Sequence, residues 1–577
     1  MSKLAGLIAV AWNVLASIGQ LIYRTVTVLT MLAFLGITAA LASGLIKPPP
    51  LPDRMTLQIS LPGMLPDMSN LASLLAAVTG DPKPALFELT DALYTAATDP
   101  RVGAVVAKLG PGRFDLAQNQ AIAAALDAVK AAGKPTYVFS DSFGELSPGY
   151  AAYHLASAFD EIWLQPVGQL AATGIAVETN FYGGLLDSLG IRREFGFREE
   201  YKTVQHHLLF AGPTGAQAEM MQDLATNLQS QTEEDIARGR GMSPRKLHDL
   251  LNDAPYTDTQ ALALNLVDKL GYEDELLNSL TARYGEAVLL PTYLRKMARR
   301  YRQEDAPSVG LVAIEGALAR GTGGSADLFG GRSQGADSIA KAIDHLASQE
   351  RIETIILRID SPGGSPAAAE TIRRAVVSSQ ARGKRVIASM ASTAGSGAYW
   401  LAASADRILA ESATLTGSIG VAGGKLDVSG LLASLGIRTA QIETTDRAGM
   451  WSMSRAYTAS EAHARDRLLD AAYARFIVRV AEGRGIGAEK VAKIAKGRIW
   501  TGREAYELGL IDRLGGLETA IAEARVMMRL PPNAPINLVR ANRPNDVPQL
   551  VRTLFGTVMG SLTTMLQLEL ADLRVVA

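Results

Sequence analysis

A serine hydroxyl and a lysine amine stand out because each lies in a segment that occurs twice, and only one copy carries it. Ser396 lies between two glycines, and the other copy of its segment has Tyr150 at that position. Lys202 lies in Tyr201-Lys202-Thr203, and its counterpart is Ala448. A serine becomes a nucleophile when a base removes its proton, and a lysine is such a base when burial keeps it neutral. The two copies together therefore predict one serine–lysine pair.

The duplication extends over most of the chain. GYAAYHLASAFDEI at 149–162 returns as GSGAYWLAASADRI at 395–408, an offset of 246. RVGAVVAKLG at 101–110 corresponds to RIETIILRID at 351–360, an offset of 250. The nearly constant offset indicates a tandem repeat with short insertions and deletions.

A glycine-rich turn is the next candidate for chemistry. Asp360-Ser361-Pro362-Gly363-Gly364 follows an apolar strand directly, and two glycines there let backbone amides point into a cleft as an oxyanion hole requires. The amide of Gly397, beside Ser396, is the second candidate donor. The alternatives are an ordinary tight turn and, for Ser396, a helix-capping serine. The first copy has Gly110-Pro111-Gly112-Arg113-Phe114 here and lacks the double glycine.

Composition excludes several other chemistries. The chain has no cysteine, which excludes disulfides, thiolate metal sites and a cysteine nucleophile. Its 57 Lys and Arg nearly balance its 58 Asp and Glu, so no basic surplus suggests nucleic acid. No histidine stands in an evident Ser-His-Asp arrangement. The adjacent His206 and His207 lack partners at ligand spacing, so we expect no metal, and no phosphate-binding glycine motif indicates a cofactor.

The elements that must position these groups alternate between strand and helix, which predicts parallel βαβ units. The first copy repeats this order from Leu57 onward. Gly321–Gly335, rich in Gly and Ser, is expected to be a mobile loop. In the second copy we expect strands at Val309–Ile314, Thr354–Ile359 and Arg385–Met390, and helices at Ala336–Ser348, Ala367–Ala381 and Gly397–Ala405.

The chain therefore divides into five expected parts. They are an N-terminal anchor at 1–50, an N-terminal repeat at 51–290, a charged linker at 291–307, a C-terminal repeat at 308–540 and a tail at 541–577. Apolar residues at every fourth position of the tail predict an amphipathic helix. That helix could serve a partner subunit, the membrane or its own domain.

Residues 25–46 carry no charge and would form about 33 Å of helix, enough to cross a bilayer. A cleavable signal peptide is the alternative, because Ala40-Leu41-Ala42 resembles a cleavage site. The apolar run is longer than a typical signal core, so we expect an uncleaved anchor. The charges on its two sides are nearly equal and leave its orientation open.

Together these segments resemble the long form of the signal peptide peptidase A (protease IV) family, membrane-anchored bacterial serine peptidases. The resemblance covers nearly the whole chain and rests on Tyr201-Lys202-Thr203, Asp360–Gly364, Gly395–Trp400 and Thr416–Val421. It implies an α/β fold of tandem ClpP/crotonase-like (spiral ββα) domains behind an N-terminal transmembrane helix. Taken by itself, the glycine-rich turn Asp360–Gly364 is less specific, because the wider ClpP/crotonase fold shares it. The lysine motif departs from the family, which commonly continues to Glu-Pro; here Val204-Gln205-His206-His207 follows.

The resemblance also implies a role for each matching residue. Ser396 would be the nucleophile, Lys202 the general base, Ser418 the residue that positions the lysine, and Gly364 (or Gly363) with Gly397 the oxyanion hole. It implies a peptidase that degrades cleaved signal peptides and other apolar peptides without a cofactor. The expected location is the bacterial inner membrane, single-pass, with the catalytic domains on the periplasmic side. A homo-oligomer is expected, with a tetramer favoured.

Two other functions stay open on the sequence. A crotonase-like acyl-CoA enzyme would use paired amides but would need neither Ser396 nor Lys202. A catalytically silent membrane scaffold would leave Ser396 unlabelled by a fluorophosphonate or a peptide aldehyde. Whether the serine and lysine meet within one chain or between two chains is also open.

Overall fold

The computed structural model describes residues 50–68, 84–297, 300–301, 305–326 and 332–541. The expected anchor at 25–46 and the expected tail, from residue 542 on, lie outside the described residues. Within the part of the chain that is described, no helix combines the length and apolar character needed to cross a membrane. Residues from Arg54 onward form one compact unit.

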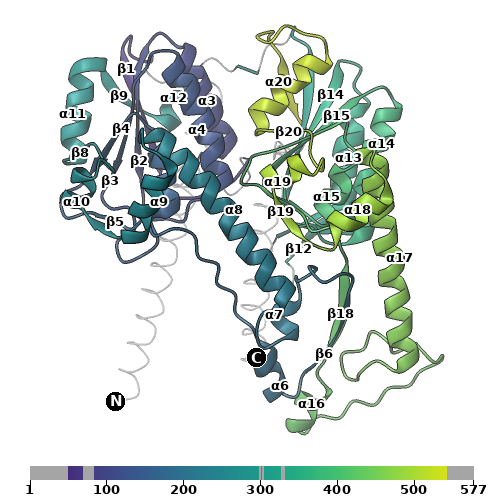
Figure 1. Cartoon of the computed structure of the whole chain (residues 1–577). Coiled ribbons are helices and arrows are strands. Elements are labelled where there is room, and N and C mark those ends of the chain that lie inside the picture. Colours follow the sequence, from purple (N-terminus) through teal and green to yellow (C-terminus); the bar gives the residue numbers. More distant parts are fainter. Residues whose placement is uncertain (1–49, 69–83, 298–299, 302–304, 327–331, 542–577) are drawn as a thin grey trace, which may run out of the picture. The chain divides into compact units, whose positions relative to one another are not determined.

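The first repeat is built on a six-stranded sheet in the order β8-β4-β3-β2-β1-β9, with every pair parallel (Figure 1). Its strands are β1 Met55–Leu61, β2 Val102–Leu109, β3 Thr136–Ser140, β4 Glu161–Leu164, β8 Lys269–Leu270 and β9 Glu286–Leu289. The helices between and after them are α3 Leu86–Thr98, α4 Leu116–Ala131, α5 Tyr150–Ala156, α9 Pro244–Asp253, α10 Asp258–Ala263, α11 Glu273–Tyr284 and α12 Leu290–Lys296. A small antiparallel pair, β5 Gln169–Leu170 with β7 Tyr256–Thr257, lies outside this sheet.

The second repeat has an eight-stranded sheet in which β14 and β15 are central. Its strands are β10 Ser308–Glu315, β14 Ile352–Ser361, β15 Arg385–Gly395, β16 Arg407–Ala410, β17 Leu415–Gly417, β19 Ile499–Thr501, β20 Arg513–Leu514 and β21 Asn537–Arg540. Its helices are α13 Ala336–Ala347, α14 Pro366–Ala381, α15 Gly397–Ala402, α18 Ala488–Ala495, α19 Gly502–Glu507 and α20 Leu517–Met527. These elements confirm the expected strand–helix order. They also extend it, because β15 continues five residues past the expected end to reach Ser396.

The prediction of a mobile loop at Gly321–Gly335 was wrong at both ends of that range. β12 Gly323–Ala326 pairs antiparallel with β13 Arg332–Gly335, which also pairs with β11 Ala317–Ala319. Backbone hydrogen bonds to a neighbouring strand thus override a glycine-rich composition that by itself disfavours strands. The expected linker at 291–307 begins inside α12, and its Tyr301 is buried with its hydroxyl donating to Glu518.

The duplication persists in the tertiary contacts. The buried Tyr153 of α5 donates its hydroxyl to the carbonyl of Leu266 at 2.7 Å, and the buried Tyr399 of α15 donates to that of Leu510 at 2.8 Å. Each bond ties a helix to a loop in its own repeat, the one between α10 and β8 or the one between α19 and β20. Corresponding ion pairs are Arg240 with Asp268 and Arg484 with Asp512.

The two repeats are joined by a two-stranded ribbon. β6 Arg192–Phe197 of the first repeat pairs antiparallel with β18 Ala422–Asp427 of the second. The short helices α6 Gly183–Ser188 and α16 Ser429–Ser434 flank this ribbon in the lower part of Figure 1. Two long helices, α8 Gly215–Gly239 and α17 Ala459–Arg484, lead from this region back to their own repeats. Beyond β6 the chain continues through Lys202 to α7 His206–Leu209, so the ribbon sets where the lysine lies.

Candidate active site

Ser396 occupies the one-residue junction between β15 and α15. Its backbone has φ +54° and ψ −120°, which is unusual for a residue with a side chain and marks a strained turn. The Ser396 amide donates to the carbonyl of Gly417 at 2.9 Å, which holds the turn against β17. Its hydroxyl makes no capping hydrogen bond to α15. The capping alternative therefore has no support in the geometry.

Lys202 reaches this serine from the first repeat of the same chain. Its Nζ lies 3.1 Å from Oγ of Ser396, 2.8 Å from the carbonyl oxygen of Ser418 and 2.9 Å from Oγ of Ser418. These three oxygen atoms can form hydrogen bonds with Lys202 in either protonation state of its amine. An ammonium donates to all three, and a neutral amine donates twice and accepts the Ser396 proton.

Burial determines the charge of this amine. Lys202 is only 4% exposed, and removal from water lowers its pKa from 10.5 to about 7. Desolvation is the one cause of this shift; no carboxylate counteracts it. The close packing comes partly from Gly497, where a Cβ would lie 2.4 Å from the Lys202 backbone nitrogen. A large fraction of the lysine is therefore neutral at physiological pH.

The glycine turn after β14 lies against Ser396. Gly364 has φ +150°, and its two neighbours bond to Leu318: the Leu318 amide donates to the Gly363 carbonyl, and the Ser365 amide donates to the Leu318 carbonyl. This pairing directs the Gly364 N–H to the opposite side. A Cβ on Gly397 would lie 3.2 Å from the Gly364 nitrogen, so the two residues are packed closely against each other.

The two glycines of the turn differ in what their amides do. The Gly363 amide donates to Oγ of Ser361 at 3.1 Å, whereas among the described residues neither Gly364 nor Gly397 donates its amide to an acceptor. Two unused donors beside a serine hydroxyl are the arrangement that a developing oxyanion needs. This geometry favours Gly364 over Gly363 as the partner of Gly397.

A buried ion pair supports the strands that carry these groups, and the sequence analysis missed it. Arg358 of β14 is 3% exposed and binds Asp67 of the first repeat through two hydrogen bonds of 2.7 and 2.8 Å. It also donates to Ser389 Oγ and the Met390 carbonyl of β15. A charged residue within the apolar run TIILRID was the signal that could have revealed it, because buried charges are paired.

A pocket of about 490 Å³ adjoins the serine and lysine, and both repeats line it. Gly395, Thr416 and Ser418 form the wall nearest the reactive groups. The pocket is more apolar than polar, which suits an apolar side chain. Its apolar lining comprises Tyr182, Val204, Met221, Pro362, Leu415 and Ile499.

The same positions in the first repeat carry no comparable groups. Tyr150, the counterpart of Ser396, is buried and hydrogen-bonds through its hydroxyl to Thr232 at 2.6 Å. At the same offset, Ala172 stands where Ser418 stands. Of the adjacent histidines, His206 is packed between Phe197 and Phe210 with ring centroids 5.0 and 4.9 Å away. Within the described residues, no group of three or more acidic or histidine side chains is placed to hold a metal ion.

Comparison with known proteins gives a consistent result. A sequence model of peptidase family S49 matches residues 128–285 and 378–530, together more than half of the chain. The chain is 29% identical over 458 residues to Protease 4 of Salmonella typhi, covering 77% of this chain and 72% of that protein. It is 27% identical over 543 residues to Protease 4 of Haemophilus influenzae, covering 90% and 86%. The chloroplastic serine protease SPPA of Arabidopsis thaliana is 27% identical over 488 residues, covering 82% and 70%.

Proposed function

Because this chain belongs to peptidase family S49, we propose that it is a serine endopeptidase with Ser396 as nucleophile and Lys202 as general base. One observation carries the assignment of these roles: a buried amine with a pKa of about 7 lies 3.1 Å from a serine hydroxyl on a strained turn. A base is most useful when its pKa is near the working pH, since it is then both neutral and able to hold a proton.

The reaction proceeds in two halves. Neutral Lys202 takes the Ser396 proton as Oγ attacks the peptide carbonyl, and the amides of Gly364 and Gly397 bind the oxyanion. The lysine ammonium then gives that proton to the leaving amine, and an acyl-enzyme remains. In the second half Lys202 removes a proton from water, which attacks the ester carbonyl; the ester bond then breaks, the carboxylic acid leaves, and the lysine ammonium returns its proton to Oγ of Ser396. Ser418 positions Lys202 through its hydroxyl and its carbonyl.

The division of the site supports the proposed domain organisation. Each repeat, 51–290 and 308–540, is a domain of the ClpP/crotonase-like spiral type, and the first supplies the base while the second supplies the nucleophile and oxyanion hole. Neither domain is active alone, because each holds half of the acid–base machinery.

The proposed substrates are apolar peptides, including cleaved signal peptides that remain in a membrane. The apolar pocket beside Ser396 supports this substrate class. An enzyme anchored by residues 25–46 in the bacterial inner membrane, with its catalytic domains on the periplasmic side, would share the bilayer with these substrates. The proposed assembly is a homo-oligomer, with a tetramer favoured. The relatives, which are named as proteases, do not favour an acyl-CoA enzyme or a silent scaffold.

Active-site labelling tests this function. A fluorophosphonate probe should modify the full-length protein at Ser396, and the protein should cleave an apolar peptide. Ser396→Ala should lose both signals, and Lys202→Met should lose cleavage. Hydrolysis that persists in Ser396→Ala would refute the proposed nucleophile and favour the crotonase-like acyl-CoA enzyme.

A further inference from the structure

A short loop of the second repeat, residues 496–498 between α18 and β19, holds the lysine segment of the first repeat. The Lys496 carbonyl accepts the Tyr201 amide at 3.1 Å, and the Arg498 carbonyl accepts the Ser418 amide at 2.8 Å. Lys496 has φ +45°, so the loop turns sharply. The loop thus contacts both the segment that carries the proposed base and the serine that hydrogen-bonds to it.

The Arg498 guanidinium lies between two aromatic rings and two carboxylates. Its Cζ is 4.8 Å from the ring centroid of Tyr201, the neighbour of the proposed base, and 4.9 Å from that of Trp500. It also donates to Glu219 at 2.9 Å and to Asp223, both on α8 of the first repeat. The Tyr201 hydroxyl donates to the same Glu219 at 3.0 Å. A planar guanidinium can stack on rings and bind carboxylates at once, and a lysine ammonium cannot.

The sequence repeat singles out this contact in the same way as the reactive serine and lysine. At the offset of 244 that relates α8 to α17, Arg498 corresponds to Ala254. The two carboxylate partners on α8 correspond to residues without a carboxylate, His463 and Arg467. The first repeat thus has the carboxylates without the arginine, and the second has the arginine without the carboxylates. The contact is complete only when the two repeats meet.

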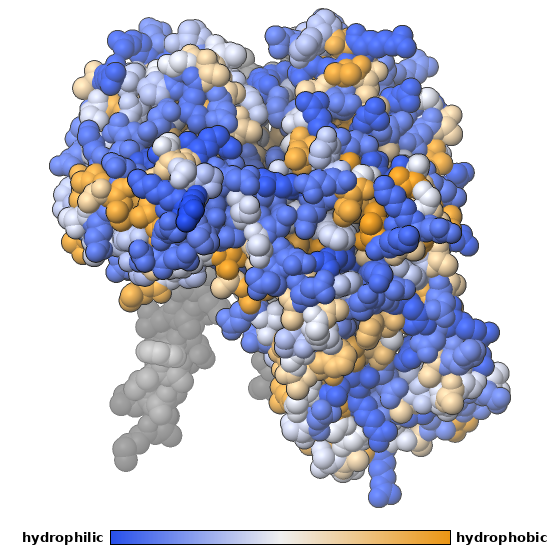
Figure 2. All heavy atoms as spheres, viewed as in Figure 1, coloured by the Kyte–Doolittle hydropathy of each residue, from blue (hydrophilic) through white to orange (hydrophobic). Residues whose placement is uncertain are grey.

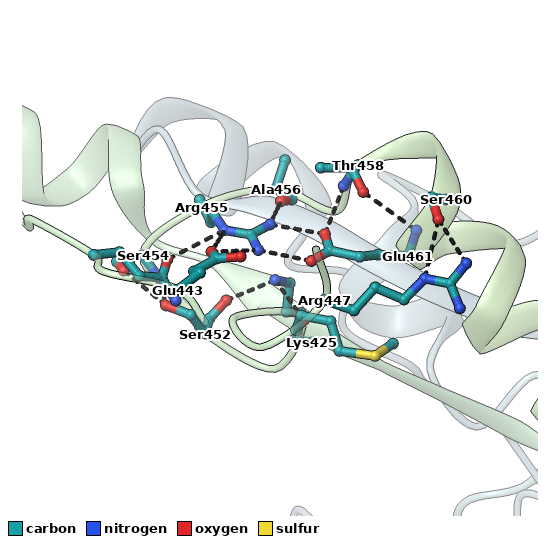
Figure 3. A network of polar contacts seen from close by, with 12 residues as sticks. Lys425, Glu443, Arg447, Ser452, Ser454, Arg455, Ala456, Thr458, Ser460 and Glu461 are labelled. Carbon is teal, nitrogen blue, oxygen red and sulfur yellow. Dashed lines mark hydrogen bonds and ion pairs between the residues drawn. The ribbon is translucent and has the colours of Figure 1, made fainter. Parts of the chain in front are cut away.

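The second copy of the lysine segment is held by its own repeat (Figure 3). Arg447, the counterpart of Tyr201, donates to Ser460 of α17 at 3.0 and 2.7 Å. Arg455 of the same segment donates to Glu461 of α17. These contacts all lie within the second repeat. The first copy differs, because the aromatic neighbour of its lysine is stacked against an arginine that the other repeat supplies.

The helix α8 connects the arginine to the substrate pocket. Glu219 and Asp223 lie four residues apart and bind Arg498. Gln217 and Met221, also four residues apart, line the apolar pocket. The exposed positions of α8 are mostly polar or charged, and Figure 2 shows a largely hydrophilic surface along this helix. The ion pairs with the arginine therefore fix the helix that forms one wall of the pocket.

Both properties that the site needs depend on close packing around this loop. Ser418 has φ +52°, a conformation that residues with side chains rarely adopt, so its neighbours must impose it. Burial is the one cause that lowers the pKa of Lys202 to about 7. A loop that moved away would release Ser418 and admit water to the amine. The pKa of Lys202 would then rise towards its ordinary value.

We propose that Arg498 is a positioning residue of the proposed serine–lysine site. Its guanidinium holds Tyr201 and its carbonyl holds Ser418, which keeps the base between them dry and in place. Arg498 is not among the residues that line the pocket, so it acts through its neighbours. This inference deepens the proposed function and rests on it.

The pH dependence of Ser396 labelling separates positioning from simple stabilisation. In full-length wild-type protein, the rate of fluorophosphonate labelling should fall below pH 7, where Lys202 becomes protonated. Arg498→Met should move this fall upward by about one pH unit, because water reaches the amine. Its labelling rate should be about tenfold lower than wild type at pH 6 and nearly normal above pH 9. A variant that was only less stable would lose labelling at every pH without a shift.

Arg503 offers a matched control on the same helix. Its guanidinium donates to Glu234 of α8 at 3.1 and 2.8 Å, so it also joins the two repeats. Among the described residues it hydrogen-bonds to neither Tyr201 nor Ser418, and Arg503→Met should leave the pH midpoint unchanged. Arg498→Lys keeps the charge without the stacked fork, so an upward shift in that variant reports lost stacking. An unshifted Arg498→Met protein, or an equal shift in Arg503→Met, would overturn the positioning role.

Two further measurements keep the outcome decisive. If Arg498→Met does not fold, Tyr201→Leu removes the stacked ring instead and should give the same upward shift; no shift would contradict the proposal. Stability gives a readout that does not depend on Ser396, because it should rise with pH between about 7 and 10.5 as the unfolded chain binds the proton that folded Lys202 has released. In Arg498→Met this rise should begin about one pH unit higher in urea titrations.

The two proposals fail in different ways. A wild-type protein that fluorophosphonate never labels would reject the peptidase assignment, and the stability slope would still report on the surroundings of Lys202. A labelled wild type whose Arg498→Met variant keeps both the labelling midpoint and the stability slope would reject the positioning role alone.

Discussion

The first repeat and the second repeat have the same scaffold and opposite losses. Tyr153 and Tyr399 make the same buried hydrogen bond in each, so the framework has been kept. The first repeat has Tyr150 in place of Ser396, and the second has Ala448 in place of Lys202. Each repeat has thus kept what the other lacks, and the ribbon β6–β18 brings the remaining groups together.

This difference shows an advantage for stability, because a chain with one buried lysine is destabilised less than a chain with two. Burial that lowers a lysine pKa from 10.5 to about 7 opposes folding at neutral pH, because the unfolded chain holds its proton more tightly. A chain with one such lysine bears this destabilisation once. Ala448 stands where a second lysine would stand; it lies in an exposed segment and carries no charge.

Removal of the nucleophile should give the largest effect and would break the comparison if it did not. Ser396→Ala should lower kcat/KM by at least about 10⁴-fold, because no acyl-enzyme can form. The counterpart Tyr150→Phe should leave the rate within about twofold and lower stability by about 1 kcal/mol through its lost hydrogen bond to Thr232. Steady-state kinetics and thermal denaturation measure the two effects. Comparable rate losses in both variants would mean that the repeats are not functionally distinct.

Removal of the proposed base, Lys202, should have the second-largest effect on the rate. Lys202→Met should lower kcat by about 10³- to 10⁴-fold, since the methionine fills the space without accepting a proton. Ala448→Lys should not change the rate, because that position is exposed. The methionine variant should also be more stable near neutral pH, by roughly 2–4 kcal/mol, because it no longer buries an amine whose pKa must fall from 10.5 to about 7 on folding. A destabilised Lys202→Met protein would contradict the burial argument.

The pH dependence sharpens the role of Lys202. Only the neutral amine is a base, so kcat/KM should fall about tenfold per pH unit below pH 7 and level off above it. Stability should rise with pH between about 7 and 10.5, because in that window the unfolded chain binds the proton that the folded lysine has released. Lys202→Met should lose this slope in denaturant titrations. A pH–rate profile flat down to pH 5 would exclude this base.

Loss of the Ser418 hydroxyl should have an intermediate effect. Ser418→Ala removes one of two Ser418 contacts to Nζ of Lys202 and should lower kcat about 10- to 100-fold with little change in KM. Its counterpart Ala172→Ser should leave kcat unchanged. A change in KM alone would show that Ser418 contacts substrate and does not position the base.

The smallest expected effect concerns the shared scaffold. Tyr153→Phe and Tyr399→Phe should each lower the free energy of unfolding by about 1–2 kcal/mol, because each leaves a buried carbonyl without its donor. Urea titration of the two single variants compares them. A several-fold difference between the two losses would show that the repeats have diverged in packing as well as in chemistry.

The sequence predicted the strand–helix order because apolar runs and breaks are local signals, and β10, β14 and β15 lie where they were expected. The proximity of Lys202 and Ser396 followed from reciprocal substitutions in the repeat. The positive φ values of Ser396 and Ser418 could not be predicted, because tertiary contacts impose them on residues that ordinarily avoid that region. The pairing of Arg358 with Asp67 likewise joins residues 291 positions apart, which no local pattern specifies.

The packing of Lys202 against Gly497 has a consequence for synthesis of the protein. The lysine is made early, but the residues that bury it and receive its hydrogen bonds are made some 200 to 300 residues later. Ribosomes extend a chain by about 5–20 residues per second, so the amine waits many seconds as an ordinary solvated cation. Under the proposed mechanism, the growing polypeptide is consequently unable to cut itself or its neighbours until its distal half has emerged and docked.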